Sequence, residues 1–199
     1  MSLKNNLLKI YKTDINSVKV TSDLKEDIYD ELSIKSVSDL YNLIIKYSPI
    51  TEKTVFVDVG SGLGKLACHI AIVSQCKKIV GIEKNKERCK ISKKLFKTLE
   101  GVEKKSFKVI NDDILNVKDF GDVAYINDLN FPSKYTLHIW NNLKANSLMI
   151  THKQINKSYP IGRMLFKMHH KKEPFWGLIY RKPNTDGGIP SKLGININI

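Results

Sequence analysis

Apolar residues along the chain follow two different spacings. In some runs they stand next to one another and are rich in β-branched side chains, which is typical of strands buried on both faces of a sheet. These runs cover 54–59, 78–82, 106–110, 123–126 and 147–151. In other stretches apolar residues recur every three or four positions, which predicts helices that pack by one face. These stretches cover 36–47, with Ser36 as the predicted N-cap, 65–73, 85–99 and 135–143. Because the two kinds alternate, the pattern predicts an α/β fold with a doubly wound, mostly parallel sheet.

The two ends of the chain follow other patterns. Residues 1–12 carry leucines at helical spacing and predict a short packing helix. Two apolar runs, 164–168 and 175–180, are joined by a short polar connection and predict an antiparallel hairpin at the sheet edge. The sequence therefore predicts a small N-terminal helical segment (1–50), a main domain (51–182) and a C-terminal tail (183–199).

The composition fits an intracellular globular protein. The 199 residues are 42% hydrophobic and 27% charged, which suits one domain with a sizeable core. The three cysteines form no C-x-x-C pair, so we expect reduced thiols in the nucleus or cytoplasm and no structural metal. The apolar runs are far shorter than the roughly 20 residues that cross a bilayer, so we expect a soluble protein that binds no membrane.

The charge of the chain predicts an anionic partner. Thirty-three Lys and Arg oppose 20 Asp and Glu, for a net charge of +13, so nucleic acid, an acidic protein patch or an anionic cofactor are the candidates. Two stretches concentrate this charge: 84–108 has ten basic residues against three acidic ones, and 153–182 has eight against one, a net +7 in each. The first stretch also fits a solvated helix face, whereas the second lies nearer the predicted substrate entrance.

The strongest chemical signal is a glycine-rich turn after the first predicted strand. Residues 57–64 read Val-Asp-Val-Gly-Ser-Gly-Leu-Gly, and 19 residues after Gly64 the next strand ends in Glu83. Glycines let the backbone approach a nucleoside, and an acid at the end of the second strand can accept hydrogen bonds from both ribose hydroxyls. The two features together indicate a cofactor that contains a nucleoside.

Three kinds of nucleotide site compete at this turn. A P-loop would need glycine at Val59 and Ser or Thr at Leu66, so that pattern fails twice. The dinucleotide fingerprint G-x-G-x-x-G does not match the spacing G-x-G-x-G either, although an NAD-like site or an inactive relic stays open. The observed spacing, with Asp58 two residues before the first glycine, resembles motif I of the seven-strand S-adenosylmethionine methyltransferases.

Further segments resemble the disruptor-of-telomeric-silencing family, the non-SET histone lysine methyltransferases. The matching segments, in chain order, are 29–32, 56–64, 81–84, 112–115, 125–131 and 175–177. The resemblance covers about 29–182 and implies a seven-strand Rossmann-like methyltransferase sheet, S-adenosylmethionine as cofactor and a role in chromatin. The chain departs from the family pattern at Leu32, Lys65, Ile114, Asp128 and Leu129.

The resemblance also implies a role for each matching residue. For the cofactor, Glu83 would bind the ribose, Asp113 the adenine amino group and Ile114 the adenine face, while Asp58 and Gly60 would hold the methionine end. Gly62 would leave the space that the close approach of the backbone to the cofactor requires, and Tyr29 and Glu31 would close the cofactor from above. For catalysis, Asn127 would contact the methyl acceptor, and Phe131 and Trp176 would form the wall of the lysine channel. Without the family context, Asp113 fits a solvated turn, Asn127 a strand-end cap, and the two aromatic residues simple core packing.

The acceptor loop bears on the substrate. Methyltransferases that act on base amino groups usually carry Asn/Asp-Pro-Pro-aromatic there to hold a flipped base, and residues 127–132 lack the proline pair. We therefore expect a protein-lysine N-methyltransferase, with a histone or nucleosome as the substrate that the resemblance implies and with nucleic acid contacts through the lysine-rich surface. An RNA or small-molecule methyltransferase of the same fold, or an inactive basic binding module, stays open.

Overall fold

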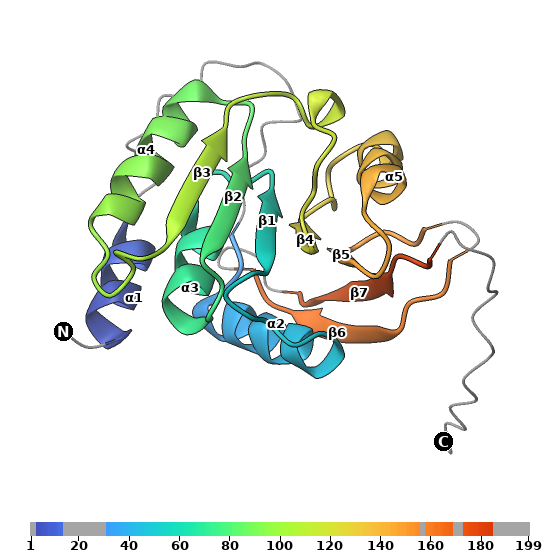
Figure 1. Cartoon of the computed structure of the whole chain (residues 1–199), viewed down its shortest axis with the longest axis horizontal. Helices are drawn as coiled ribbons and strands as arrows, with labels where there is room; N and C mark the ends of the chain where they lie inside the picture. Colours follow the sequence, from blue (N-terminus) through green and yellow to red (C-terminus); the bar gives the residue numbers. More distant parts are fainter. Residues whose placement is uncertain (1–2, 14–30, 156–157, 169–172, 185–199) are drawn as a thin grey trace.

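The computed structural model describes residues 3–13, 31–155, 158–168 and 173–184. Its centre is a seven-stranded sheet in the order β3-β2-β1-β4-β5-β7-β6 (Figure 1). The strands are β1 (Val55–Val59), β2 (Lys78–Ile82), β3 (Ser106–Ile110), β4 (Val123–Ile126), β5 (Leu148–Thr151), β6 (Gly162–Phe166) and β7 (Phe175–Arg181). The first five strands pair in parallel, and β7 pairs antiparallel with both β5 and β6. The predicted α/β sheet with its C-terminal antiparallel hairpin is confirmed.

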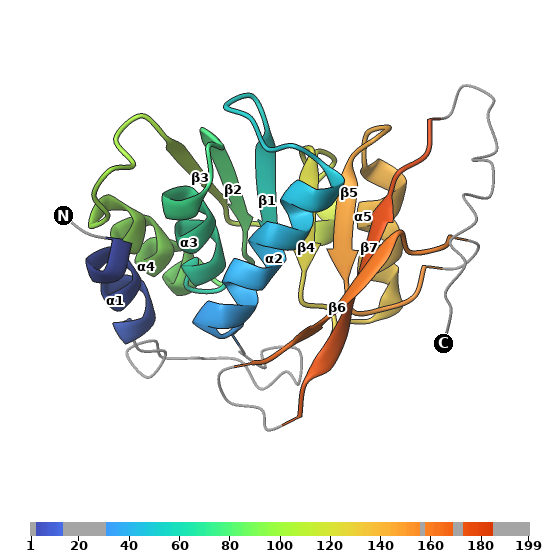
Figure 2. The ribbon, with the colours of Figure 1, turned by 90° about the horizontal axis from the view of Figure 1, so that it is seen from below.

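Helices cover both faces of the sheet (Figures 1 and 2). They are α1 (Leu3–Lys12), α2 (Ile34–Tyr47), α3 (Lys65–Val73), α4 (Lys86–Lys97) and α5 (Ser133–Asn142), with a short 3-10 turn η3 (Ile114–Asn116). One apolar cluster joins the sheet to α1 through α4, and a second joins the opposite face to η3 and α5. Because both faces are buried, the central strands consist almost entirely of apolar residues.

The helix starts follow local hydrogen bonding. Asn85 caps α4, because its side-chain oxygen accepts the main-chain N–H groups of Glu87 and Arg88. The helix α2 starts earlier than predicted. Its N-cap is Ser33, whose hydroxyl accepts the N–H of Ser36 at 3.2 Å, so Ser36 lies inside the helix rather than at the predicted cap.

The sheet order creates a site at one edge. The chain runs from β1 toward β2 and β3 on one side and returns to place β4 on the other side of β1. In open α/β sheets, ligands bind where the strand order reverses, outside the carboxyl ends of the strands. The predicted division at 50 and 182 stays a prediction, since much of the first segment and most of the tail lie outside the described residues.

Membrane-spanning helices and metal-binding clusters are both absent from the described part of the chain. Within the described ranges, no helix is both long enough and apolar enough to cross a membrane. The same ranges hold no group of three or more His, Cys, Asp or Glu side chains that could bind a metal ion.

Candidate active site

A pocket lies at the carboxyl ends of β1, β2 and β4. Its empty space, with the open mouth included, is about 1160 Å³. Of the predicted site residues, those that line it are Glu31, Asp58, Gly60, Gly62, Glu83, Asp113, Ile114, Asn127 and Phe131. Tyr29 lies outside the described residues. The fold thus brings segments between 31 and 131 to one cavity.

The glycine turn forms the floor of the pocket. Gly60, Gly62 and Gly64 have φ angles of 72°, 52° and 76°, in the left-handed region that favours glycine. The main-chain N–H groups of Gly60 and Ser61 both donate to the carbonyl of Ile82 at 2.9 Å, which ties the turn to the end of β2. A Cβ atom at position 60 would lie 3.3 Å from the ring of Phe131. A side chain at position 60 would therefore be both strained and crowded by Phe131.

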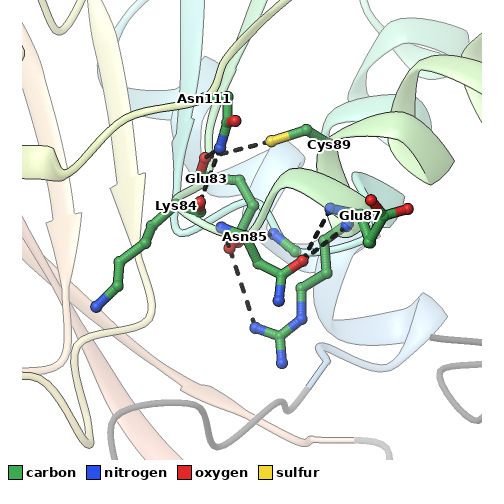
Figure 3. A network of polar contacts seen from close by, with 8 residues as sticks. Glu83, Lys84, Asn85, Glu87, Cys89 and Asn111 are labelled. Carbon is green, nitrogen blue, oxygen red and sulfur yellow. Dashed lines mark hydrogen bonds and ion pairs between the residues drawn. The ribbon is translucent and has the colours of Figure 1, made fainter. Parts of the chain in front are cut away.

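Glu83 lies in a network of polar contacts at the end of β2 (Figure 3). Its Oε2 accepts the N–H of Gly62 and its Oε1 accepts the N–H of Asn85, both at 2.8 Å, and only 7% of the residue is exposed. Asn111 and Cys89 donate to its main-chain carbonyl at 3.0 and 3.2 Å. Each carboxylate oxygen has two lone pairs, so the pair of bonds leaves capacity to accept two ribose hydroxyls.

Asp58 lies buried at the base of the same pocket. It is 4% exposed, and burial raises its pKa from 3.8 to about 7. A hydrogen bond from the main chain of Ala67 opposes this rise, and the nearby charge of Glu83 adds to it. A cation placed beside this carboxyl would favour its ionised form.

Glu31 and Lys65 form an ion pair in the pocket wall. The Lys65 ammonium lies 2.6 Å from Glu31 Oε2, and both side chains are 9% exposed. Lys65 is the first residue of α3, whereas Glu31 precedes α2, so the pair joins two elements that cover one face of the sheet. The pocket wall therefore offers both a positive and a negative group.

Asp113 and Ile114 form the opposite wall, at η3. Asp113 Oδ1 accepts the N–H of Leu115 at 2.9 Å and so caps this short helix, while Ile114 is 8% exposed. The capping bond uses one oxygen of the carboxylate. The acid is thus held in the pocket wall and not in a freely solvated turn.

Asn127 follows the end of β4 and has a buried polar atom in the pocket wall. Its Oδ1 is buried and has no hydrogen-bond partner among the described residues. Buried polar atoms are almost always paired, and an exception calls for an explanation such as a bound ligand. The ring of Phe131, in the same loop, packs against Tyr135 with centroids 5.6 Å apart.

The structure does not bring Trp176 into the pocket. Trp176 lies on β7, is 48% exposed, and its ring faces the guanidinium of Arg163 at 5.0 Å. Its neighbours Phe175 and Gly177 turn toward Phe166, on the other face of the hairpin. Because side chains alternate along a strand, Trp176 projects outward.

Sequence reasoning missed several residues that line the pocket. Apart from Lys65, those with polar side chains are Ser61, Lys84, Arg88, Tyr125, Asn130 and Tyr135. Tyr125 carried a usable signal, because it lies on β4 two positions before Asn127, which follows the strand, and alternate residues of an extended chain share a face. Lys65 was seen only as a departure from the family pattern, and its partner Glu31 lies 34 positions away, so no spacing connects them.

Comparisons with known proteins identify the family of the chain. Residues 9–161 match the sequence model of the family described as Histone methylation protein DOT1. The histone-lysine N-methyltransferase, H3 lysine-79 specific, of Caenorhabditis elegans is 31% identical over 128 residues, which cover 56% of this chain and 14% of that protein. The chain therefore spans about a seventh of the length of this relative.

Solved structures share the fold. An RNA methyltransferase from Salinibacter ruber in complex with S-adenosyl-L-homocysteine has a TM-score of 0.57 at 17% identity, and the match covers 79% of this chain and 97% of that one. A SAM-dependent O-methyltransferase from Thermotoga maritima has a TM-score of 0.59 at 14% identity, and the match covers 81% and 69%. At these identities the likeness shows a Rossmann-like methyltransferase fold.

Proposed function

Since the chain belongs to the histone methylation protein DOT1 family, we propose that it transfers the methyl group of S-adenosylmethionine to a lysine side chain of a histone. The observation that carries this proposal is the buried Oδ1 of Asn127, which lacks a partner in the same pocket that gathers Glu83 and Asp113. A hydrogen-bond acceptor is thus available to an incoming amine, beside the residues proposed to bind the nucleoside.

Different residues of the pocket suit the ribose, the adenine and the methionine end of the cofactor. Glu83 would accept the ribose hydroxyls with the lone pairs that Gly62 and Asn85 leave unused. Asp113 would accept the adenine amino group, and Ile114 would cover the adenine face. At the other end, the methionine ammonium would lie near Asp58 and Glu31, because a cation favours the ionised form of an acid whose pKa burial has raised.

The chain supplies alignment rather than acid or base chemistry. When bound, S-adenosylmethionine supplies an electrophilic methyl group on a sulfonium. The acceptor nitrogen must present a free lone pair, and an apolar aromatic wall favours the neutral amine over the ammonium by desolvation. Phe131, Tyr125 and Tyr135 provide that wall, and Asn127 Oδ1 would accept an N–H of the incoming amine.

The charge of the chain supports a polyanionic carrier for the target lysine. The net charge of +13 suits a nucleosome, whose DNA and acidic surface would attract it. The name of the curated relative specifies lysine 79 of histone H3. The region of that protein that matches this chain covers 14% of its length. A histone substrate places the proposed site of action in the nucleus.

Labelled methyl transfer tests the proposal directly. The purified chain would be incubated with labelled S-adenosylmethionine and, in parallel, with nucleosomes, free histones or RNA, with Asn127→Ala as the matched control. We expect label on histone lysine, lost in the control, while both proteins bind S-adenosylhomocysteine equally by calorimetry. Label on RNA alone would move the function to the RNA class, and absence of cofactor binding would make the chain a non-enzymatic module.

A further inference from the structure

Asp128 is a charged residue at the centre of a neutral hydrogen-bond network. The residue is 0% exposed. Its Oδ2 accepts the hydroxyls of Thr136 at 2.6 Å and Thr151 at 2.5 Å, and its Oδ1 accepts the main-chain N–H of His152 at 2.7 Å. A buried carboxylate is costly unless such bonds compensate for lost water, so the network constrains all four residues together.

The donors belong to different elements of the fold. Thr136 lies in α5, Thr151 is the last residue of β5, and His152 follows it, while Asp128 itself stands two residues past the end of β4. One carboxylate thus connects the ends of two parallel strands to the helix between them. The carbonyl of Asp128 also accepts the N–H of Phe131 at 3.2 Å, which closes the turn 128–131.

This turn includes or adjoins the residues assigned to the methyl acceptor. Asn127, immediately before Asp128, holds the buried Oδ1 that lacks a partner among the described residues. Phe131, at the end of the turn, lies so close to the glycine floor that a Cβ on Gly60 would meet its ring at 3.3 Å. A shift of the turn would therefore move both groups relative to the cofactor site.

The network also reaches a second wall of the pocket through His152. The His152 Nδ1 lies 2.9 Å from the main-chain carbonyl of Trp176, and Nε2 lies 3.2 Å from the hydroxyl of Tyr125. Because the carbonyl can only accept, Nδ1 carries the hydrogen, and in the neutral imidazole Nε2 then accepts the hydroxyl hydrogen of Tyr125. By fixing the main chain of His152, Asp128 fixes the ring that orients Tyr125, which lines the pocket.

We propose that Asp128 is the positioning residue for the methyl acceptor, and that it acts through Asn127, Phe131 and Tyr125 without touching the substrate. The inference rests on the proposed function. The groups assigned to the nucleoside, Glu83 and Asp113, follow β2 and β3 and lie outside this network. We therefore expect Asp128 to affect turnover far more strongly than cofactor affinity.

The test compares Asp128→Ala with Asp128→Asn. The alanine removes all three acceptor bonds, and we expect kcat to fall at least tenfold while the Kd for S-adenosylhomocysteine stays within twofold. The asparagine keeps an oxygen for the His152 N–H, and its NH₂ can donate to the two threonine hydroxyls. We expect this variant to restore most of the turnover.

Two further measurements keep the test decisive. Thr136→Val removes one bond and predicts a smaller fall in kcat, so it replaces the alanine variant if that variant does not fold. Hydrogen exchange needs no substrate, and it should become faster over 123–143 with alanine but not with asparagine. Turnover within twofold of wild type in Asp128→Ala, equal losses in both Asp128 variants, or unchanged exchange would overturn the proposal. If the wild-type chain methylates nothing, the proposed function fails, and the exchange contrast still decides the positioning role.

Discussion

The main-chain N–H of Gly62 donates a 2.8 Å hydrogen bond to the carboxylate of Glu83, across two neighbouring strand ends. The same carboxylate accepts the N–H of Asn85, at the start of α4. Glu83 therefore holds the glycine turn and the next helix before any ligand arrives, and its assigned role toward the ribose depends on that scaffold.

Glu83→Ala should weaken binding of S-adenosylhomocysteine by roughly 10- to 150-fold, since a hydrogen bond to a charged group contributes about 1.5–3 kcal/mol. Glu83→Gln should fall between wild type and alanine, because its NH₂ cannot accept the N–H groups of Gly62 or Asn85. Calorimetry measures the affinities, and circular dichroism confirms the fold. Unchanged affinity in a folded alanine variant would show that the ribose binds elsewhere.

The glycine floor allows a prediction with an internal control. Gly60 and Gly101 have nearly equal φ angles of 72° and 77°, but a Cβ at position 60 would meet Phe131 at 3.3 Å, whereas at position 101 it would meet nothing within 4 Å. Alanine at either site should cost about 1 kcal/mol of stability through backbone strain. Only Gly60→Ala should also lower cofactor affinity, measured by calorimetry beside thermal unfolding. Equal affinities in the two variants would contradict the close fit at the floor.

Sequence reasoning located the cofactor side of the pocket because parallel strands bring their carboxyl ends to one edge. Gly60, Glu83 and Asp113 follow β1, β2 and β3 in turn, so their order along the chain is sufficient to bring them together. The burial of Asp128 could not be predicted in this way. An acid in a loop is expected to be exposed to water, and only tertiary contacts with α5 and β5 bury this one. The antiparallel hairpin likewise turns Trp176 outward, which no local pattern indicates.

The ion pair between Glu31 and Lys65 predicts strong coupling between two distant positions. Removing one partner leaves a charge buried with a side-chain exposure of only 9%, so Lys65→Met or Glu31→Gln alone should cost about 3–5 kcal/mol. The double variant should be clearly more stable than the sum of the two losses implies. Denaturant unfolding of the four proteins measures this. Additive losses would mean that the two charges do not interact in solution.

The buried carboxyl of Asp58 predicts a pH dependence of a definite sign. Its folded-state pKa of about 7 exceeds the ordinary 3.8, so between these values the folded chain binds more protons than the unfolded chain. Stability should therefore fall as pH rises from 4 to 7, by up to about 1.4 kcal/mol per unit of pKa difference. Burial lowers the pKa of His69 to about 4, which gives a contribution of the opposite sign.

Comparing wild type with Asp58→Asn isolates the carboxyl, because His69 is present in both proteins. The asparagine variant should be the more stable of the two near pH 7, with the difference vanishing toward pH 4. A difference that does not change with pH would reject the raised pKa. Affinity for S-adenosylhomocysteine, whose ammonium would face this group, should rise toward pH 7 in wild type only.

The basic surface should affect binding of the nucleosome and not the methyl-transfer step. Lys167 is exposed, and it lies with Lys171 and Lys172 in the basic stretch 153–182. Replacing these three lysines by glutamine should reduce methylation of nucleosomes and flatten its salt dependence, because each lost phosphate contact releases one counterion fewer. Methylation of a short free histone peptide should change little.

The matched control replaces Lys90, Lys93 and Lys94 on α4, which removes the same charge from the other basic stretch. If both triple variants weaken nucleosome methylation equally, net charge alone steers the encounter. If the first triple variant loses peptide and nucleosome activity alike, the basic stretch belongs to the catalytic pocket and does not dock the carrier.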